Sequence, residues 1–120
     1  MRTVFLFCLC LAMQFFSAQA MSEADGPDYW AVNGIAANSH LNQRAGPSIE
    51  FSIVGRIPGD FKSLLNLACY PNFTFAEWER FNDAERKLAM EMRWCKVRYK
   101  DVTGWVYAKY LTEGMPLDLN

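Results

Sequence analysis

Aromatic and cationic side chains gather near the C-terminal end of this 120-residue chain. Period-two alternation along two predicted strands puts them on one face of a sheet, opposite the face that carries Val97 and Val106. Flat rings beside positive charges suit a bound peptide or sugar. The alternative is that Trp105 packs in the core and Trp94 packs on a neighbouring helix. The candidate ligand-binding residues are Trp94, Lys96, Arg98, Trp105 and Tyr107.

The sequence has no residue pattern typical of catalysis. The G-x-S-x-G, H-E-x-x-H and P-loop motifs are absent. Carboxylates at positions 77–91 alternate with basic residues, as on a solvated helix face. His40 is the single histidine, and no Cys-x-x-Cys pair occurs. We therefore expect neither an enzyme, nor a metal site, nor a cofactor.

The first 20 residues have the three parts of a cleavable secretory signal peptide. Arg2 supplies the positive charge, an apolar run extends from Val4 to Phe16, and small residues precede a cleavage site after Ala20. The alternative is an uncleaved anchor, but this run is shorter than the roughly 20 residues that cross a bilayer. We expect a helical signal peptide at 1–20 and a periplasmic or secreted protein that leaves the membrane after cleavage.

Removing 20 of the 120 residues leaves 100, which suits one domain. Of 12 basic and 13 acidic residues, cleavage removes Arg2, so 11 and 13 remain and the net charge is near −2. Nucleic-acid binders usually carry a strong basic patch, so nucleic acid is not an expected partner. We expect a flexible tail at 21–28, a domain at 29–112 and a C-terminal tail at 113–120.

Two cysteines, Cys69 and Cys95, remain after the signal peptide is removed. An even number of cysteines in an exported chain indicates a disulfide. Both fall on apolar faces of predicted strands, in phase with Leu67 and Val97. If these strands pair antiparallel, the opposed Cβ atoms come within reach of a disulfide. The alternative is a pair of buried free thiols.

Short alternating segments separated by turn signals predict a mainly β fold. In the fourth segment Leu65, Leu67 and Cys69 are expected to share one face. A short helical turn is expected at 108–111. The predicted strands are 30–37 (with a turn signal at Asn33-Gly34), 41–44, 50–57, 61–70, 94–99 and 104–107.

Residues 71–93 interrupt the strands with a helical pattern. Thr74 and Glu77 form a capping box, and the sequence predicts a helix over about 74–92. Asn82 is a second possible cap, so two short helices are the alternative. Asp83 and Lys87 are expected to pair. The apolar stripe is expected to pack on the sheet, or, if exposed, to form a patch for a protein partner; its members are Phe75, Trp78, Phe81, Ala84, Leu88 and Met92.

Five segments occur in an order shared with a known family. The chain resembles the bacterial SH3-like domain family (SH3b) over residues 30–111. The resemblance implies a small, partly open β-barrel and a non-catalytic binding module, and exported members with two cysteines at matching places look similar. The segments are Leu-Asn-Gln-Arg-Ala-Gly-Pro-Ser at 41–48, Ile-Val-Gly-Arg-Ile-Pro-Gly at 53–59, Trp-Cys-Lys-Val-Arg-Tyr at 94–99, Thr-Gly-Trp-Val at 103–106 and Tyr-Leu at 110–111.

The chain departs from the family at two places. Gln43 stands where the family usually has an apolar residue, and residues 71–93 replace a short hairpin loop. Arg44 is expected to fix the following turn through hydrogen bonds. The expected function is an exported SH3-like module of the bacterial envelope that binds peptidoglycan peptides or a partner protein. The alternative is a small structural or regulatory protein, such as an enzyme inhibitor, acting through its insert helix.

Overall fold

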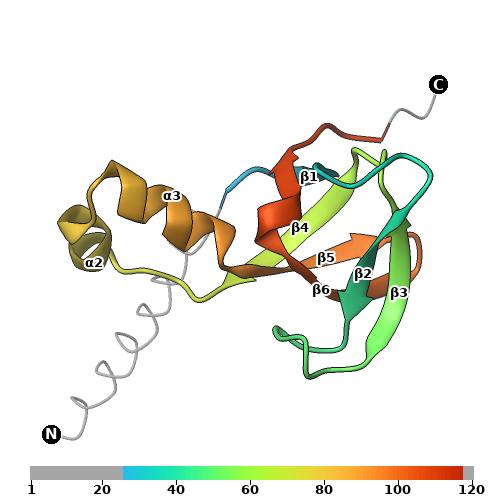
Figure 1. Ribbon diagram of the computed structural model, residues 1–120, viewed down its shortest axis with the longest axis horizontal. Coiled ribbons are helices and arrows are strands. Elements are labelled where there is room, and N and C mark those ends of the chain that lie inside the picture. Colours follow the sequence, from blue (N-terminus) through green and yellow to red (C-terminus); the bar gives the residue numbers. More distant parts are fainter. Residues whose placement is uncertain (1–25, 118–120) are drawn as a thin grey trace, which may run out of the picture.

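The computed structural model describes residues 26–117, so the predicted signal peptide and residues 21–25 lie outside the described residues. Within this range the chain forms strands, two α-helices and one 3-10 turn (Figure 1). The helical elements are α2 (Phe75–Arg80), α3 (Asp83–Glu91) and the 3-10 turn η2 (Ala108–Tyr110). The strands are β1 (Tyr29–Val32), β2 (His40–Arg44), β3 (Ile53–Pro58), β4 (Leu64–Tyr70), β5 (Trp94–Tyr99), β6 (Val102–Tyr107) and β7 (Leu111–Glu113).

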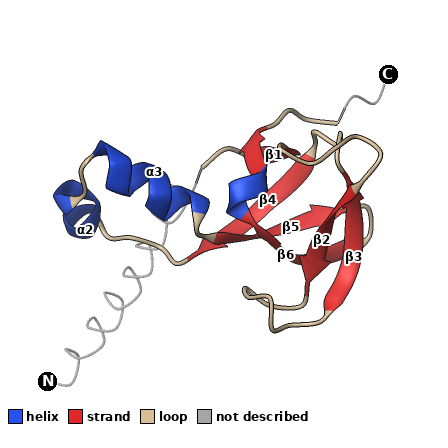
Figure 2. Cartoon of the chain, in the orientation of Figure 1, coloured by secondary structure: helices blue, strands red, loops and turns tan. Residues whose placement is uncertain are grey.

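All seven strands join one antiparallel sheet in the order β3-β2-β6-β5-β4-β1-β7. The sheet is curved, and α2 and α3 project from it to one side (Figure 2). The predicted mainly β fold with a helical insertion is confirmed. Strand β7 was not predicted, because its three residues are too few to show an alternating pattern; it pairs with β1.

The core lies on the inner face of the curved sheet. Cys95 and Val97 of β5 are fully buried, as their alternation predicts, and Val106 of β6 is buried beside them. The rings of Phe61 and Tyr99 pack edge to face on each other, with their centroids 4.9 Å apart. Both side chains pack against this core. The residues that alternate with Cys95, Val97 and Val106 along β5 and β6 therefore lie on the outer face of this hairpin.

Strand β4 corrects one prediction. Its register against β5 shifts between Asn66 and Ala68, which is a β-bulge at Leu67. A bulge adds one residue to a strand and reverses which side chains face inward beyond it. Leu64 and Cys69 are therefore the buried residues of β4, while Leu67 is exposed. The expected common face of Leu67 and Cys69 is wrong for this reason.

Gln43 is a fully buried polar residue. Its Nε2 donates hydrogen bonds to the carbonyls of Val97 and Val102, both at 3.2 Å. A Cβ at Gly55 would collide with Gln43 Oε1, and a Cβ at Gly104 would lie 2.8 Å from Gln43 Cγ. Two glycines thus make the room that a polar side chain fills at this position, and the amide joins β2 to the β5–β6 hairpin.

The predicted disulfide is present. Cys69 and Cys95 are directly opposed in the β4–β5 ladder and are bonded. Tyr70 and Trp94 form the next pair in this ladder, and the insert begins directly after Tyr70. The bond therefore fixes both ends of residues 71–93 to the core.

The insert forms two helices, which was the stated alternative to one. Thr74 accepts a hydrogen bond from the amide of Glu77, and Asn82 accepts one from the amide of Glu85, so each helix begins at a capping box. Lys87 pairs with Glu91 at 2.7 Å instead of with Asp83, and this hydrogen bond lowers the pKa of the Glu91 carboxyl. In residues 26–117 no helix combines the length and the apolar character needed to cross a membrane.

Replacing both cysteines in Cys69→Ala/Cys95→Ala should reduce the free energy of unfolding. The bond closes a loop with a sequence separation of 26, for which the chain-entropy estimate is about 3 to 4 kcal/mol. We expect a loss of about 2 to 4 kcal/mol in urea denaturation. Reductant should destabilise the parent protein by a similar amount and leave the double variant unchanged. Equal stability of the two oxidised proteins would contradict the prediction.

Gly55→Ala should destabilise the protein by about 1 to 3 kcal/mol, because the new methyl group meets the Gln43 side chain. The loss should be smaller when Gln43→Ala is also present, since truncation frees the space the methyl group needs. A double-mutant cycle in urea measures this coupling, for which about 0.5 kcal/mol or more is expected. Additive effects would show that the two side chains do not compete for one space.

Candidate functional site

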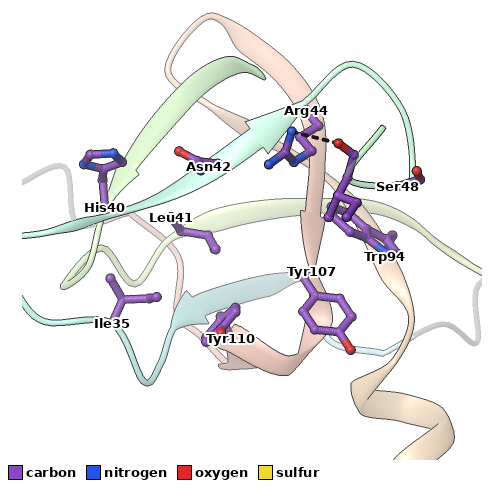
Figure 3. A pocket seen from close by; sticks show the side chains of 10 residues that line it. Ile35, His40, Leu41, Asn42, Arg44, Ser48, Trp94, Tyr107 and Tyr110 are labelled. Atoms are coloured by element: carbon purple, nitrogen blue, oxygen red, sulfur yellow. Dashed lines mark hydrogen bonds between the residues drawn. The ribbon is translucent and has the colours of Figure 1, made fainter. Parts of the chain in front are cut away.

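The described part of the chain contains a groove of about 630 Å³. It lies between β2, the loop at 45–52 and the end of β6 with η2 (Figure 3). Its volume falls within the range of small-molecule and peptide sites. The groove is lined by Ile35, His40, Leu41, Asn42, Arg44, Ser48, Ile49, Trp94, Tyr107 and Tyr110.

One wall of the groove is aromatic. Trp94 and Tyr107 are cross-strand partners on the outer face of β5 and β6, with ring centroids 5.4 Å apart. Tyr110, on η2, continues the row at 6.1 Å from Tyr107. Strand alternation thus turns two rings outward, and the 3-10 turn adds a third. Such a row offers flat, half-buried surface for stacking or for apolar side chains.

The other wall is polar and belongs to β2. His40, Asn42 and Arg44 alternate with the buried Leu41 and Gln43, so the three polar side chains share the outward side of the strand. Figure 3 shows them in a row along β2, across the groove from Tyr107 and Tyr110. The Asn42 side-chain oxygen is buried there without a hydrogen-bond partner.

Arg44 holds the loop at 45–52 in place. Its Nη1 donates to the carbonyl of Phe51 at 2.9 Å and to that of Ile49 at 3.2 Å. The Phe51 ring lies over Gly46, where a Cβ would be 2.6 Å from the ring. The expected role of Arg44 in fixing this turn is confirmed. The loop presents Ile49, which is 74% exposed, at the rim of the groove.

The structure brings some of the predicted site residues together and separates others. Trp94 and Tyr107 line the groove. Lys96 and Trp105 face each other across the β5–β6 ladder farther along the same outer face, and neither lines the groove. Arg98 is exposed two ladder positions farther along, opposite Thr103.

Sequence reasoning missed the contribution of β2 and of the segment before it. Ile35, His40 and Asn42 reach the groove because β2 pairs with β6, the strand next to β5. No local pattern reveals which distant strands become neighbours. The alternation of β2 did carry a usable signal, because His40, Asn42 and Arg44 stand at period two. The Trp94 ring packs against the Tyr107 ring.

The insert presents a second surface. Phe73, Trp78 and Phe81 form an aromatic cluster with centroids 5.5 to 6.1 Å apart. Neither α2 nor α3 contains a buried residue, and Phe75 is 78% and Leu88 56% exposed. The expectation that Phe75 and Leu88 pack on the sheet is therefore wrong, because the helices project from the sheet.

The described residues hold no group of three or more His, Cys, Asp or Glu side chains placed to bind a metal ion. The groove combines aromatic rings, one guanidinium, one imidazole and amide or hydroxyl groups. Side chains of these types can stack on flat groups and form hydrogen bonds. No family model, curated protein or solved structure matches this chain.

Proposed function

We propose that this chain is an exported, non-catalytic binding module of the bacterial envelope with an SH3-like barrel, and that it binds peptidoglycan peptides or a partner protein. The observation that carries the proposal is the groove, with the aromatic row of Trp94, Tyr107 and Tyr110 facing the polar row of β2. Grooves lined by aromatic rings are a recurring means of holding extended peptides.

Two further observations support the export and fold parts of the proposal. The Cys69–Cys95 bond is of a kind that persists in oxidising compartments, which agrees with the signal-peptide pattern of residues 1–20. The curved antiparallel sheet has its strands at the segments that carry the SH3b resemblance, including 94–99 and 103–106.

The test is co-sedimentation with purified sacculi. The full reading frame is expressed in a bacterium, and the protein recovered from the periplasm should have an intact mass that begins at Met21. We expect this protein to pellet with sacculi and Trp94→Ala to pellet several-fold less, because the variant removes one ring of the groove. Trp105→Ala is the matched control, since Trp105 lies on the same face outside the groove.

Both variants must keep the circular dichroism spectrum and melting behaviour of the parent protein. Equal pelleting of the parent and Trp94→Ala would show that the groove is not the wall-binding site. Absence of pelleting would exclude peptidoglycan and leave a partner protein as the ligand.

A second candidate function is regulatory docking through the insert. The observation that favours it is the exposure of apolar side chains on the insert, above all Phe75, Leu88 and Met92, and neither helix contains a buried residue. Exposed apolar side chains gathered on one segment suit a protein interface.

Shortening the insert separates the two candidates. In one variant Asn-Gly replaces residues 72–92, which suits a tight turn between antiparallel strands. In another, Phe75→Ser/Leu88→Ser changes exposed positions, where stability should shift by less than about 1 kcal/mol. If the groove carries binding, both variants keep the affinity of the parent for sacculi or an isolated partner. If the insert carries it, both lose that affinity while Trp94→Ala keeps it.

A further inference from the structure

The two walls of the groove differ in charge and polarity, and this difference defines a class of ligand. We propose that the groove binds a short extended peptide with a carboxylate beside Arg44 and an apolar side chain against Trp94 and Tyr107. This inference rests on the proposed function, because it uses the same groove, and it adds the chemistry that the ligand must have.

The backbone of β2 offers an open edge to such a peptide. β2 pairs with β3 from His40 to Arg44, but its pairing with β6 is confined to Arg44 opposite Trp105. Continued in register, that ladder would pair Asn42 with Tyr107. Both residues instead line the groove. The groove therefore lies where β2 and β6 separate.

Alternate residues of a strand direct their N–H and C=O groups to the same edge. Some of residues 40–43 therefore present backbone donors and acceptors on the side from which β6 has diverged. An extended peptide that adds to this edge gains main-chain hydrogen bonds of the kind used in strand addition. From His40 to Arg44 the edge is about 13 Å long at roughly 3.3 Å per residue, which fits four residues of ligand.

The charge of the groove selects an anionic peptide. None of the ten lining residues is an aspartate or glutamate. Arg44 forms no ion pair with a described carboxylate, and its two hydrogen bonds to the loop both use Nη1. A guanidinium has five N–H donors, so those on Nε and Nη2 are available to a ligand carboxylate. Ser48 lies at the same end of the groove (Figure 3).

The aromatic row sets the second requirement. Trp94 lies at the Arg44 end and Tyr107 beside it (Figure 3). A ligand whose carboxylate meets Arg44 therefore places a neighbouring side chain on these two rings, where an aliphatic or aromatic group buries apolar surface. Leu41 and Ile35 continue the apolar lining toward the His40 end.

Four synthetic tetrapeptides and one sugar test the proposal by NMR titration of the oxidised protein at neutral pH. Three peptides are acetyl-Ala-X-Leu-Ala amides in which X is Glu, Gln or Lys. The fourth is acetyl-Ala-Gln-Leu-Ala with a free C-terminal carboxylate. A tetramer of N-acetylglucosamine is the neutral glycan. The two acidic peptides distinguish a side-chain carboxylate from a C-terminal one.

We expect at least one acidic peptide to bind about tenfold or more tightly than the Gln amide, the range for a hydrogen bond to a charged group. The Lys peptide should bind most weakly. Arg44→Gln should remove the preference for acid. Arg98→Gln, which changes an exposed arginine outside the groove, should keep it. Because Arg44 also fixes the loop, raising the salt concentration gives a second measurement: the preference for acid in the parent protein should shrink.

Equal affinities for all four peptides, the C-terminal acid included, would overturn the proposed ligand class while leaving the groove as a peptide site. Stronger shifts with the glycan than with any peptide would overturn it in favour of a sugar. If no probe shifts the groove resonances at millimolar concentration, the ligand class is also wrong. The pelleting of Trp94→Ala with sacculi then decides separately whether the groove binds the wall.

Discussion

The pairing of Cys69 with Cys95 is the constraint on which the other features of the domain depend. Both side chains are buried and directly opposed in the ladder between β4 and β5. Their covalent bond fixes the register of these strands, and alternation along β5 then directs Val97 into the core and Trp94 outward. By fixing this register, the bond positions the β5 residues of the core, the two ends of the insert and one wall of the groove. In a domain of this size such a bond is a large share of the net stability.

The groove results from incomplete pairing between β2 and β6. β2 leaves β6 after a single paired position at Arg44, and the buried amide of Gln43 holds it to the β5–β6 hairpin. This attachment uses hydrogen bonds where a larger apolar side chain would otherwise fill the space, and it depends on glycines at 55 and 104. The buried Gln43 side chain thus anchors the polar wall. Recognition and folding share β2, so its inward residues stabilise the sheet while its outward residues face a ligand.

Local chemistry made much of the fold predictable. The caps at Thr74 and Asn82, the alternation of β5 and the cysteine pair all act within a few residues or through one covalent bond, and all are present. The bulge at Leu67 was not predictable, because the run around it is apolar on both faces and a one-residue slip leaves the pattern unchanged. Trp94 and Tyr107, which line the groove, were among the predicted site residues. The outer face of β5 and β6 was recognised from alternation, but the wall from β2 depends on how β2 and β6, which are far apart in the chain, diverge.

The attachment of the insert has a consequence for how this sequence can change. Residues 71–93 leave and rejoin the sheet at two adjacent positions, Tyr70 and Trp94, that are already held together by the bonded cysteines. Since the ends of the segment are fixed, its length and content have a small effect on the chain entropy of the remaining domain. α2 and α3 contribute no buried residue. The connection between β4 and β5 is therefore a position at which evolution can exchange, lengthen or remove the inserted segment. Such a change would leave the sheet and its groove unchanged.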